Sequence, residues 1–293
     1  MQRADRQLSA QEVSETDKPR LWEEAGLKAR GGIMAQEPSP WKLYDQLIEG
    51  VPEGPLVTDY CLGTHWSYLE AECGMGVSFT TRGGAKRTDK RDLRGLPLHE
   101  VAALAKSWCF EEASIGVAAL NAWYARHELT DALGATYDET VDLPDGTIRK
   151  IDAFELYRPE ITEKGNAKVT VVGHFPHVDR IAEYAQLSVL ERNPHDDDLP
   201  DPACEYIVPE QDYLFMTGVT IINKTAPRLL ALAEGVTTIM VGPSVVMSPK
   251  LFDYGVDMLA GSVVADPEKT RFAVKTGAGQ FFGEALQMCS IRA

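Results

Sequence analysis

The sequence lacks the paired cysteines of a zinc ribbon or a thioredoxin-like redox centre. No C-x-x-C pair occurs, and the five cysteines are odd in number and widely spaced: Cys61, Cys73, Cys109, Cys204 and Cys289. Reduced thiols in a cytoplasm are therefore the expected state. The chain also lacks an apolar run of roughly 18 residues, which a membrane-spanning helix requires, and no signal peptide is visible. These absences predict a soluble cytoplasmic protein.

Basic residues are scarce relative to acidic ones. The chain has 29 Lys and Arg against 44 Asp and Glu, which gives a formal net charge of −15. Such a surface repels nucleic-acid phosphates and anionic membranes unless its basic residues cluster. The segment at 82–95 carries six Lys or Arg and two Asp, and we interpret it as a solvated loop. We expect no nucleic-acid or membrane partner.

Two familiar fingerprints of catalysis and cofactor binding are missing. No G-x-S-x-G occurs, so the sequence gives no sign of a serine nucleophile elbow. The full G-x-G-x-x-G of a dinucleotide site is absent too, because GHFPHV at 173–178 has one glycine where three are expected. A standard NAD site is not expected. Whether the protein is an enzyme stays open.

The 293 residues are enough for two domains. Residues 1–35 are polar and predict a flexible N-terminal extension. Residues 36–150 predict a small α+β domain, with a helix from Trp41, strands over 55–71 and 74–82, and helices over 96–108 and 111–128. The domain junction is placed within 130–165, which holds turn residues and few periodic runs.

Residues 151–293 alternate between strand and helix patterns. Strands are predicted at 168–173, 187–194, 212–218, 237–244 and 256–264, and helices at 174–186, 226–235 and 248–255, with a mostly helical tail at 266–289. This alternation favours parallel pairing. The predicted fold class is α/β: a C-terminal Rossmann-like, doubly wound parallel sheet with the smaller α+β domain before it.

Small polar residues follow two of these strands. They are Thr217, Gly218, Thr220, Asn223 and Thr225 after the first, and Gly242, Pro243 and Ser244 after the second. Ligands of open parallel sheets bind at the carboxyl ends of the strands. Helix capping accounts for one of these side chains. It does not account for four hydroxyl or amide groups within nine residues. We therefore predict ligand contacts here.

The ends of the first two predicted strands supply further candidates. Gly173 closes one strand, with His174 directly after it, and Glu191 ends the next, where a Rossmann protein often keeps the acid that binds a ribose hydroxyl. His174 and Glu191 are also the candidate metal ligands. The plain alternatives are an exposed histidine near a helix start and an ordinary loop carboxylate.

Asn121 stands out in the N-terminal domain because it interrupts the apolar helix SIGVAALNAWY. A buried polar group without partners costs about 1–3 kcal/mol. Asn121 is therefore expected to face solvent, to bond a neighbouring backbone, or to project into a cleft between the domains.

Several ordered motifs carry a family resemblance: SIGVAALNA, VTVVGHFP, VLERNP, TGVTIINKT and VGPSVVMSPKLFDYGVDMLAG. Over about residues 41–285 the chain resembles the putative heavy-metal chelation family, long described as a domain of unknown function. The resemblance implies an enolase N-terminal-like domain before a Rossmann-like domain, with a site in the cleft between them. The positions that match its motifs are Asn121, Gly173, Glu191, Thr217, Gly218, Thr220, Asn223, Thr225 and Ser244.

The resemblance implies binding or processing of a metal ion or metal chelate, yet few of these residues are good transition-metal ligands. Our first hypothesis is a small-molecule-binding protein that takes an anionic or metal-chelate ligand in the interdomain cleft. The alternative is an enzyme that uses a nucleotide or adenosyl-type cofactor, and a third possibility is a non-catalytic interaction protein. The cofactor, the ligand and a possible homo-oligomeric state are not fixed by the sequence.

Overall fold

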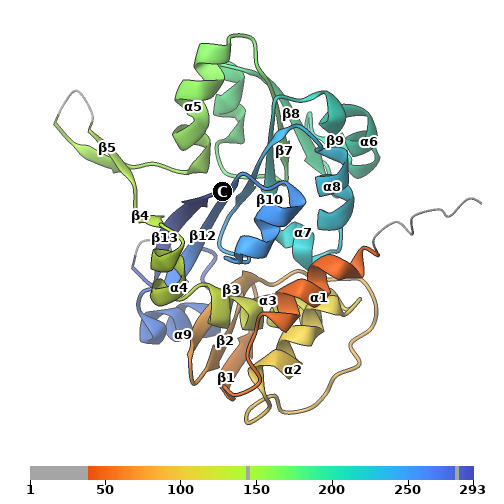
Figure 1. The fold of residues 1–293 in the computed structure, drawn as a ribbon, viewed down its shortest axis with the longest axis vertical. Coiled ribbons are helices and arrows are strands. Elements are labelled where there is room, and N and C mark those ends of the chain that lie inside the picture. The colour runs from red at the N-terminus through yellow and green to blue at the C-terminus, as the bar shows by residue number, and fades with distance from the viewer. Residues whose placement is uncertain (1–38, 143–145, 281–283) are drawn as a thin grey trace, which may run out of the picture. The chain divides into compact units, whose positions relative to one another are not determined.

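The computed structural model describes residues 39–142, 146–280 and 284–293. Residues Ser39–Ala293 form one compact unit (Figure 1). The predicted extension at 1–35 lies outside the described residues. Within the described residues a small antiparallel sheet precedes a mostly parallel eight-stranded sheet, which confirms the predicted α/β fold class. None of the helices in these residues is both long and apolar enough to cross a membrane.

The N-terminal part contains an antiparallel meander whose strands lie in chain order. Its strands are β1 (Val57–Leu62), β2 (Trp66–Ala71) and β3 (Gly74–Phe79). Its helices are α1 (Trp41–Glu49), α2 (Leu98–Ala102), the 3₁₀ helix η1 (Ala103–Lys106), α3 (Phe110–Tyr124) and α4 (His127–Ala132). These elements agree with the predicted order of strands and helices.

Side chains alternate between the two faces of this small sheet, and apolar side chains pack on both faces. Leu69 and Ala71 of β2 pack into the core that also holds α3, whereas Trp66 and Tyr68 point to the opposite face. α3 lies directly on β3. A side chain at Gly76 would place its Cβ 2.2 Å from the backbone nitrogen of Ala122, so glycine is required for this close approach.

The eight-stranded sheet has the order β4-β13-β12-β11-β10-β7-β8-β9. Its strands are β4 (Thr136–Tyr137), β7 (Lys168–Val172), β8 (Gln186–Glu191), β9 (Leu199–Pro200), β10 (Tyr213–Thr217), β11 (Thr237–Val241), β12 (Met258–Val264) and β13 (Leu286–Arg292). The six strands β7, β8, β9, β10, β11 and β12 are parallel to one another. Taken in chain order they lie as 3-2-1-4-5-6, which is the Rossmann order.

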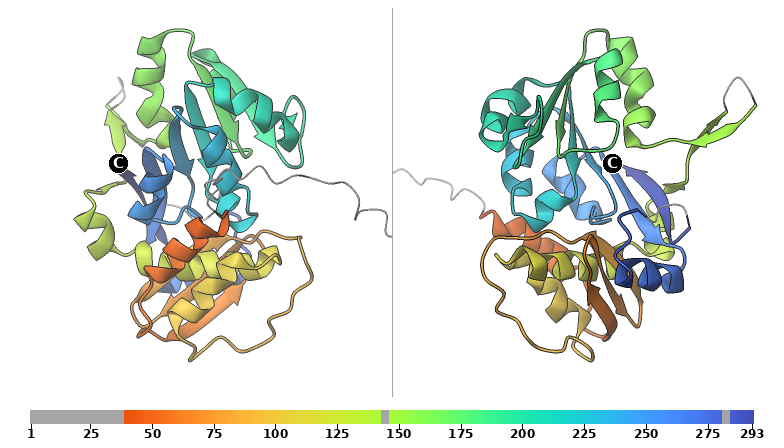
Figure 2. Two further views of the ribbon diagram at one scale, coloured as in Figure 1. Left: turned by 45° about the vertical axis from the view of Figure 1, so that its right-hand side comes forward. Right: turned by 180° about the vertical axis from the view of Figure 1, so that it is seen from behind.

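Short helices connect these strands and cover the sheet (Figure 2). They are α5 (Ala153–Lys164), η2 (Val178–Glu183), η3 (Asp201–Ala203), α6 (Cys204–Ile207), η4 (Val208–Glu210), α7 (Val219–Ile222), α8 (Ala226–Leu232), η5 (Pro249–Tyr254) and α9 (Pro267–Lys275). Nearly continuous runs of buried apolar side chains in β7, β10 and β11 fit strands that are covered on both faces.

Three predicted helical segments differ from the structure. The helix predicted at 174–186 is only the 3₁₀ helix η2, because His177 takes a left-handed conformation with φ 61° and delays the helix to Val178. The helix predicted at 248–255 is the 3₁₀ helix η5. The tail is helical only over α9 and then returns as β13, which pairs antiparallel with β12.

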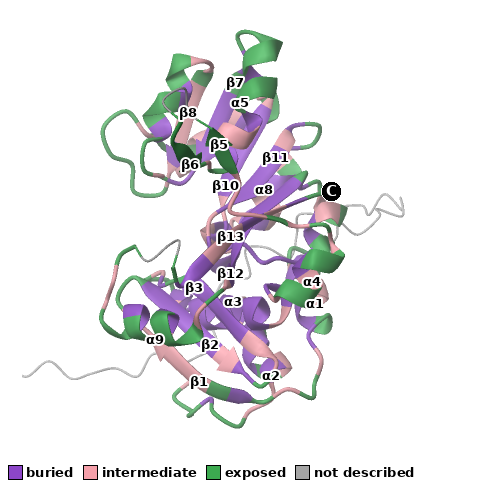
Figure 3. Cartoon of the chain, turned by 90° about the vertical axis from the view of Figure 1, so that its left-hand side faces the viewer, coloured by how far each residue is buried: buried purple, intermediate pink, exposed green. Residues whose placement is uncertain are grey.

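The segment expected to hold the domain junction contains regular structure of its own. It contributes β4 to the large sheet, α5, and a hairpin of β5 (Thr140–Asp142) and β6 (Ile148–Lys150). All six strand residues of the hairpin are exposed (Figure 3), and in Figure 1 it projects from the rest of the chain.

The two sheets share one apolar core. α1 and α3 of the N-terminal part pack with α7 and with Val245–Met247 in that core. The Tyr44 hydroxyl of α1 donates to the Ile221 carbonyl at 2.7 Å. On the other face of the small sheet, Trp66 Nε1 donates to the Gly279 carbonyl at 2.8 Å. The N-terminal part is therefore joined to the large sheet through buried contacts.

Candidate functional site

The carboxyl ends of four neighbouring parallel strands form a row, which we call the carboxyl edge. In spatial order these ends are Glu191 of β8, Gly173 after β7, Thr217 of β10 and Gly242 after β11. The chain order reverses between β7 and β10, and this switch point is where open α/β sheets bind ligands. The fold therefore brings the separately predicted strand ends together.

Gly173 lies against Thr217 at the switch point. Gly173 has φ +106°, a conformation that L side chains rarely adopt, and an added Cβ would lie 2.9 Å from Thr217 Cγ2. Its N–H donates to the Leu190 carbonyl at 3.0 Å, which ties β7 to β8. Glycine is thus needed here both for the backbone angle and for the close packing.

The ring of Phe175 covers two of the strand ends. It lies 3.5 Å from the position that a Cβ would take at Gly173 and 3.9 Å from the equivalent position at Gly242. The ring is half-buried and packs edge-on against Phe154, with 5.4 Å between centroids. Sequence reasoning did not select Phe175, although it stands in the motif VTVVGHFP.

Ser244 joins the carboxyl edge to the small sheet. Its hydroxyl, in a residue that is 3% exposed, accepts a hydrogen bond from the Phe79 N–H at 2.7 Å. Pro243 beside it is also buried. The Ser244 backbone lies so close to Gly218 that a Cβ at Gly218 would meet the Ser244 carbonyl carbon at 2.4 Å. The predicted residues Gly218 and Ser244 therefore build the junction between β10, β11 and β3.

Asn121 bonds neighbouring backbone, one of the three possibilities that the sequence left open. It is 2% exposed. Its Nδ2 donates to the Val77 carbonyl at 3.2 Å, and its Oδ1 accepts from the Met247 N–H at 3.4 Å. A single carboxamide thus connects α3, β3 and the segment that follows β11.

The polar residues of TGVTIINKT hydrogen-bond mostly to one another. The Thr220 hydroxyl donates to the Thr217 carbonyl at 2.7 Å, and Thr217 Oγ1 accepts from the Val219 N–H at 3.3 Å. Asn223 Oδ1 accepts from both the N–H and the hydroxyl of Thr225, at 3.1 and 2.7 Å. These bonds organise the start of α7 and the turn before α8.

Glu191 holds three backbone amides. Its Oε1 accepts from the His174 N–H at 3.2 Å, and its Oε2 accepts from the N–H groups of Arg192 and Asn193 at 2.6 and 3.4 Å. An ionised carboxylate has about four acceptor positions. Most of the capacity of Glu191 therefore fixes the loops after β7 and β8.

His174 and Glu191, the two candidate metal ligands, lie at the ends of the paired strands β7 and β8. His174 meets Glu191 through its backbone N–H, while its half-exposed imidazole pairs through Nδ1 with Asp198 Oδ2 at 3.1 Å. Within the described residues, no group of three or more His, Cys, Asp or Glu side chains gathers as a metal site would require. The donors along the carboxyl edge do not suit a bare transition-metal ion, which prefers thiolate and imidazole.

Lys224 is a partly buried cation in the predicted motif that sequence reasoning did not select. Its Nζ donates to the Ile222 carbonyl at 2.6 Å and lies 5.6 Å from the centroid of the Tyr44 ring. Burial lowers the pKa of Lys224 to about 8. Among the described residues no carboxylate forms an ion pair with Lys224. Lys224 stands within the motif TGVTIINKT, but only the tertiary structure shows that its side chain packs against Tyr44 of α1.

Two further side chains, Arg192 and Thr81, were not among the predicted ligand contacts, although Thr81 belongs to the segment at 78–81, a weaker candidate in the sequence. The exposed guanidinium of Arg192, directly after Glu191, lies 5.6 Å from the Phe110 ring centroid at the start of α3. Thr81, just after β3, donates its N–H to Ser114 Oγ at 3.0 Å, while its own Oγ1 is buried without a hydrogen-bond partner in the described part of the chain. Both contacts join segments distant in sequence.

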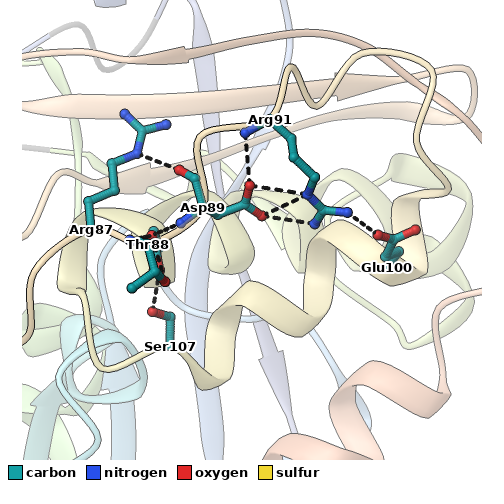
Figure 4. A network of polar contacts seen from close by, with 7 residues as sticks. Arg87, Thr88, Asp89, Arg91, Glu100 and Ser107 are labelled. Atoms are coloured by element: carbon teal, nitrogen blue, oxygen red, sulfur yellow. Dashed lines mark hydrogen bonds and ion pairs between the residues drawn. The ribbon is translucent and has the colours of Figure 1, made fainter.

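A separate open hollow lies beside the basic segment at 82–95. Its volume is about 740 Å³, and it is lined by Thr88, Asp89, Lys90, Arg91, Ala103, Leu104, Ser107 and Glu112. Buried Glu112 accepts from the N–H groups of Thr88 and Asp89 at 2.6 and 2.7 Å. Figure 4 shows the adjoining chain of contacts from Asp89 through Arg91 to Glu100. The segment is exposed as predicted, but its middle is firmly anchored.

Comparisons with known proteins agree with this architecture. Sequence profiles described as "Putative heavy-metal chelation" match residues 44–124 and 153–287. An uncharacterized protein of Methanocaldococcus jannaschii is 28% identical over 235 residues, which are 75% of this chain and 83% of that protein.

Two solved structures of proteins with unknown function are also similar. One, from Desulfitobacterium hafniense, has 34% identity and a TM-score of 0.76, covering 86% of this chain and 98% of its own. The other, from Pyrococcus horikoshii, has 23% identity and a TM-score of 0.70, covering 87% and 99%, and shows the likeness of fold alone. With both profiles matched in order and a relative covered almost completely, this chain belongs to the putative heavy-metal chelation family.

Proposed function

We propose that this protein binds an anionic organic small molecule, free or carrying a metal ion, at the carboxyl edge beside the end of β3. The observation that carries the proposal is the gathering of Gly173, Thr217 and Gly242 at the switch point of a Rossmann-ordered sheet. Glycines at strand ends let a ligand approach the backbone closely.

The donor chemistry supports an organic ligand rather than a bare metal ion. The carboxyl edge offers the partly buried hydroxyl of Thr217, the glycine backbone at Gly242 and the cationic Arg192, and the described residues offer no three-ligand metal cluster. A metal ion would therefore arrive with most of its coordination sphere filled by the organic molecule. A metal ion bound in an organic chelate would agree both with the family description and with the donor groups at the carboxyl edge.

The polar residues of the edge act mainly as a frame in this proposal. Asn121, Ser244 and Glu191 hold the surrounding loops through hydrogen bonds to backbone groups. A frame fixed in this way keeps its remaining donors in place before the ligand arrives, which lowers the entropic cost of binding.

Isothermal titration of the full chain tests the proposal. Ni²⁺ or Zn²⁺ alone should bind weakly, whereas their citrate complexes and free citrate should bind measurably. Thr217→Val keeps the side-chain shape but removes the hydroxyl at the switch point, and we expect affinity to fall about tenfold for a lost hydrogen bond. Thr140→Val, on the exposed β5–β6 hairpin, serves as the matched control. Tight binding of the bare ions with no response to citrate would contradict the proposal.

A nucleotide or adenosyl-type cofactor is the second candidate, favoured by the strand order and by Glu191 at the end of β8. Three structural features weigh against a nucleotide or adenosyl-type cofactor. η2 replaces a long helix after β7, Phe175 covers Gly173, and Glu191 already accepts three amides. Stabilisation in a thermal-shift assay by millimolar NAD, ATP or S-adenosylmethionine, lost in Glu191→Gln, would favour this candidate instead.

A further inference from the structure

Arg192 forms no ion pair with a carboxylate of the described residues. Six other described arginines do pair with Asp or Glu, namely Arg91, Arg94, Arg149, Arg228, Arg271 and Arg292, whereas Arg82, Arg87, Arg126, Arg158 and Arg180 do not. Arg192 has two contacts in the described structure. Its backbone N–H donates to Glu191, and its guanidinium lies over the Phe110 ring. With a net charge of −15, carboxylates are abundant in this chain. What sets Arg192 apart from the other unpaired arginines is its place directly after Glu191, at the end of β8 on the carboxyl edge.

The position of Arg192 is fixed by its neighbours on both sides. Glu191 Oε2 accepts the Arg192 N–H at 2.6 Å, while its Oε1 accepts the His174 N–H from the loop after β7. These two hydrogen bonds fix the turn after β8. The guanidinium then lies 5.6 Å from the Phe110 centroid, at the first residue of α3. Arg192 thus spans from the carboxyl edge to the N-terminal part of the chain.

The chemistry left free on Arg192 suits an oxyanion. A guanidinium against an aromatic ring keeps its edge N–H donors available, and their fork matches a carboxylate or phosphate with two parallel hydrogen bonds. Phe110 is itself held firmly, because the turn at Gly84 approaches its ring so that a Cβ there would lie 3.1 Å from two ring carbons. Cation and support are therefore both in place before a ligand binds.

We propose that Arg192 selects the charge of the ligand by binding its carboxylate or phosphate group, and that Glu191 is the positioning residue that holds Arg192 there. This inference rests on the proposed function, since it assigns a counter-ion to the same site. It adds that ligands without an oxyanion are rejected. It also explains the place of Glu191 without a contact between Glu191 and the ligand.

The test measures binding of citrate, pyrophosphate and uncharged glycerol to the full chain by titration calorimetry. Arg192→Gln should weaken binding of the oxyanions about 10- to 100-fold, the loss expected for a charged hydrogen-bonded pair. Arg192→Lys keeps the charge without the fork, so it should restore only part of the affinity. Because Arg192 is exposed, we expect the melting temperatures of both variants to equal that of the wild type.

Arg158 gives a matched control. It is an exposed arginine over an aromatic ring, 4.8 Å from the Tyr184 centroid, on α5. Arg158→Gln should leave oxyanion binding unchanged. A loss for pyrophosphate but not citrate assigns the Arg192 contact to phosphate, and the reverse assigns it to carboxylate.

Two outcomes would overturn this inference in distinguishable ways. Equal affinity of the wild type and Arg192→Gln for both oxyanions overturns the role of Arg192 and leaves the proposed function standing. Absence of binding of citrate, pyrophosphate and metal–citrate to the wild type overturns the proposed function and this inference together.

Discussion

At the scale of single residues, the carboxyl edge depends on positions where only one residue type fits. Gly173 combines a positive φ with contact to Thr217, and Gly218 packs against the Ser244 backbone. Lys224 shows the opposite situation, because a charged side chain is partly buried without a carboxylate partner among the described ion pairs. Each position leads to a measurable consequence for stability.

Gly173→Ala should destabilise the protein by about 1–3 kcal/mol, because alanine at φ +106° is strained and its Cβ would press on Thr217. Gly235→Ala is the matched control. Gly235 also has a positive φ of +79°, but no atom lies within 4 Å of an added Cβ, so it should lose only roughly 1 kcal/mol. Urea unfolding of both variants measures the difference. Equal losses would mean that the contact with Thr217 contributes nothing.

Lys224→Met should stabilise the protein at pH 7 by on the order of 1 kcal/mol, because burial of the ammonium group is removed. The folded-state pKa of about 8 lies below the ordinary value near 10.4 for a lysine. Between these values the unfolded chain binds more protons, so the stability of the wild type rises with pH through this window. The advantage of Lys224→Met should therefore shrink from pH 8 to pH 10. A constant difference across that range would contradict the assigned burial cost.

At the scale of elements, side-chain hydrogen bonds to backbone groups decide which loops are held. Glu191 holds the turns after β7 and β8, and Glu112 of α3 holds the middle of the basic segment. The β5–β6 hairpin has no such anchor along its exposed strand residues, although Lys150 pairs with Asp138 and Arg149 with Glu155. Exposure alone therefore does not separate anchored loops from projecting ones.

Glu112→Gln should release the segment at 86–94 and cost about 1–3 kcal/mol, because a charged acceptor of two backbone amides is lost. Trypsin should then cut the Lys- and Arg-rich segment faster. Burial by itself would raise the pKa of Glu112, but hydrogen bonds from Ser107, Asp89 and Thr88 outweigh it and lower the pKa. The stabilisation is therefore present above the ordinary glutamate pKa and is lost as the pH falls through the lowered value.

Glu100→Gln provides the control for this prediction. Glu100 is exposed and pairs only with Arg91 on the surface, so its loss should cost less than about 1 kcal/mol. Equal trypsin rates for Glu112→Gln and the wild type would show that Glu112 does not anchor the segment.

At the scale of the whole molecule, the largest apolar core crosses from the small sheet to the large one. Two smaller clusters pack on other faces of the sheets. Asn121 lies within the largest core and bonds to backbone on both sides. The two sheets should therefore unfold together. Domain boundaries at 150/151 remain a prediction from the sequence pattern.

Asn121→Leu should lower stability by roughly 1–3 kcal/mol for each of the two backbone groups left without a partner. Circular dichroism and tryptophan fluorescence should report one coincident melting transition in the wild type and in the variant. Asn223→Ala, which removes only the two local turn bonds from Thr225, should cost about 1 kcal/mol. Separate transitions for the two probes would contradict a shared core.

Periodic patterns in the sequence were sufficient for much of the fold. Alternating strand and helix patterns predicted the parallel sheet, because buried strands and amphipathic helices carry local signatures. Local patterns failed at 174–186, where His177 in a left-handed conformation left only a short 3₁₀ helix. They failed again in the tail, where β13 forms by pairing with β12, a contact that no local pattern encodes.

The sequence by itself determined the fold class, the family and the segments that carry the strand ends, because these depend on periodicity and ordered motifs. Only the tertiary structure decided what the polar residues do. It showed Asn121, Ser244 and Glu191 bonded to backbone groups, and it brought Arg192 over Phe110. The physical reason is that hydrogen bonds and charge pairs form between segments distant in the chain, and their partners exist only after the sheets have packed.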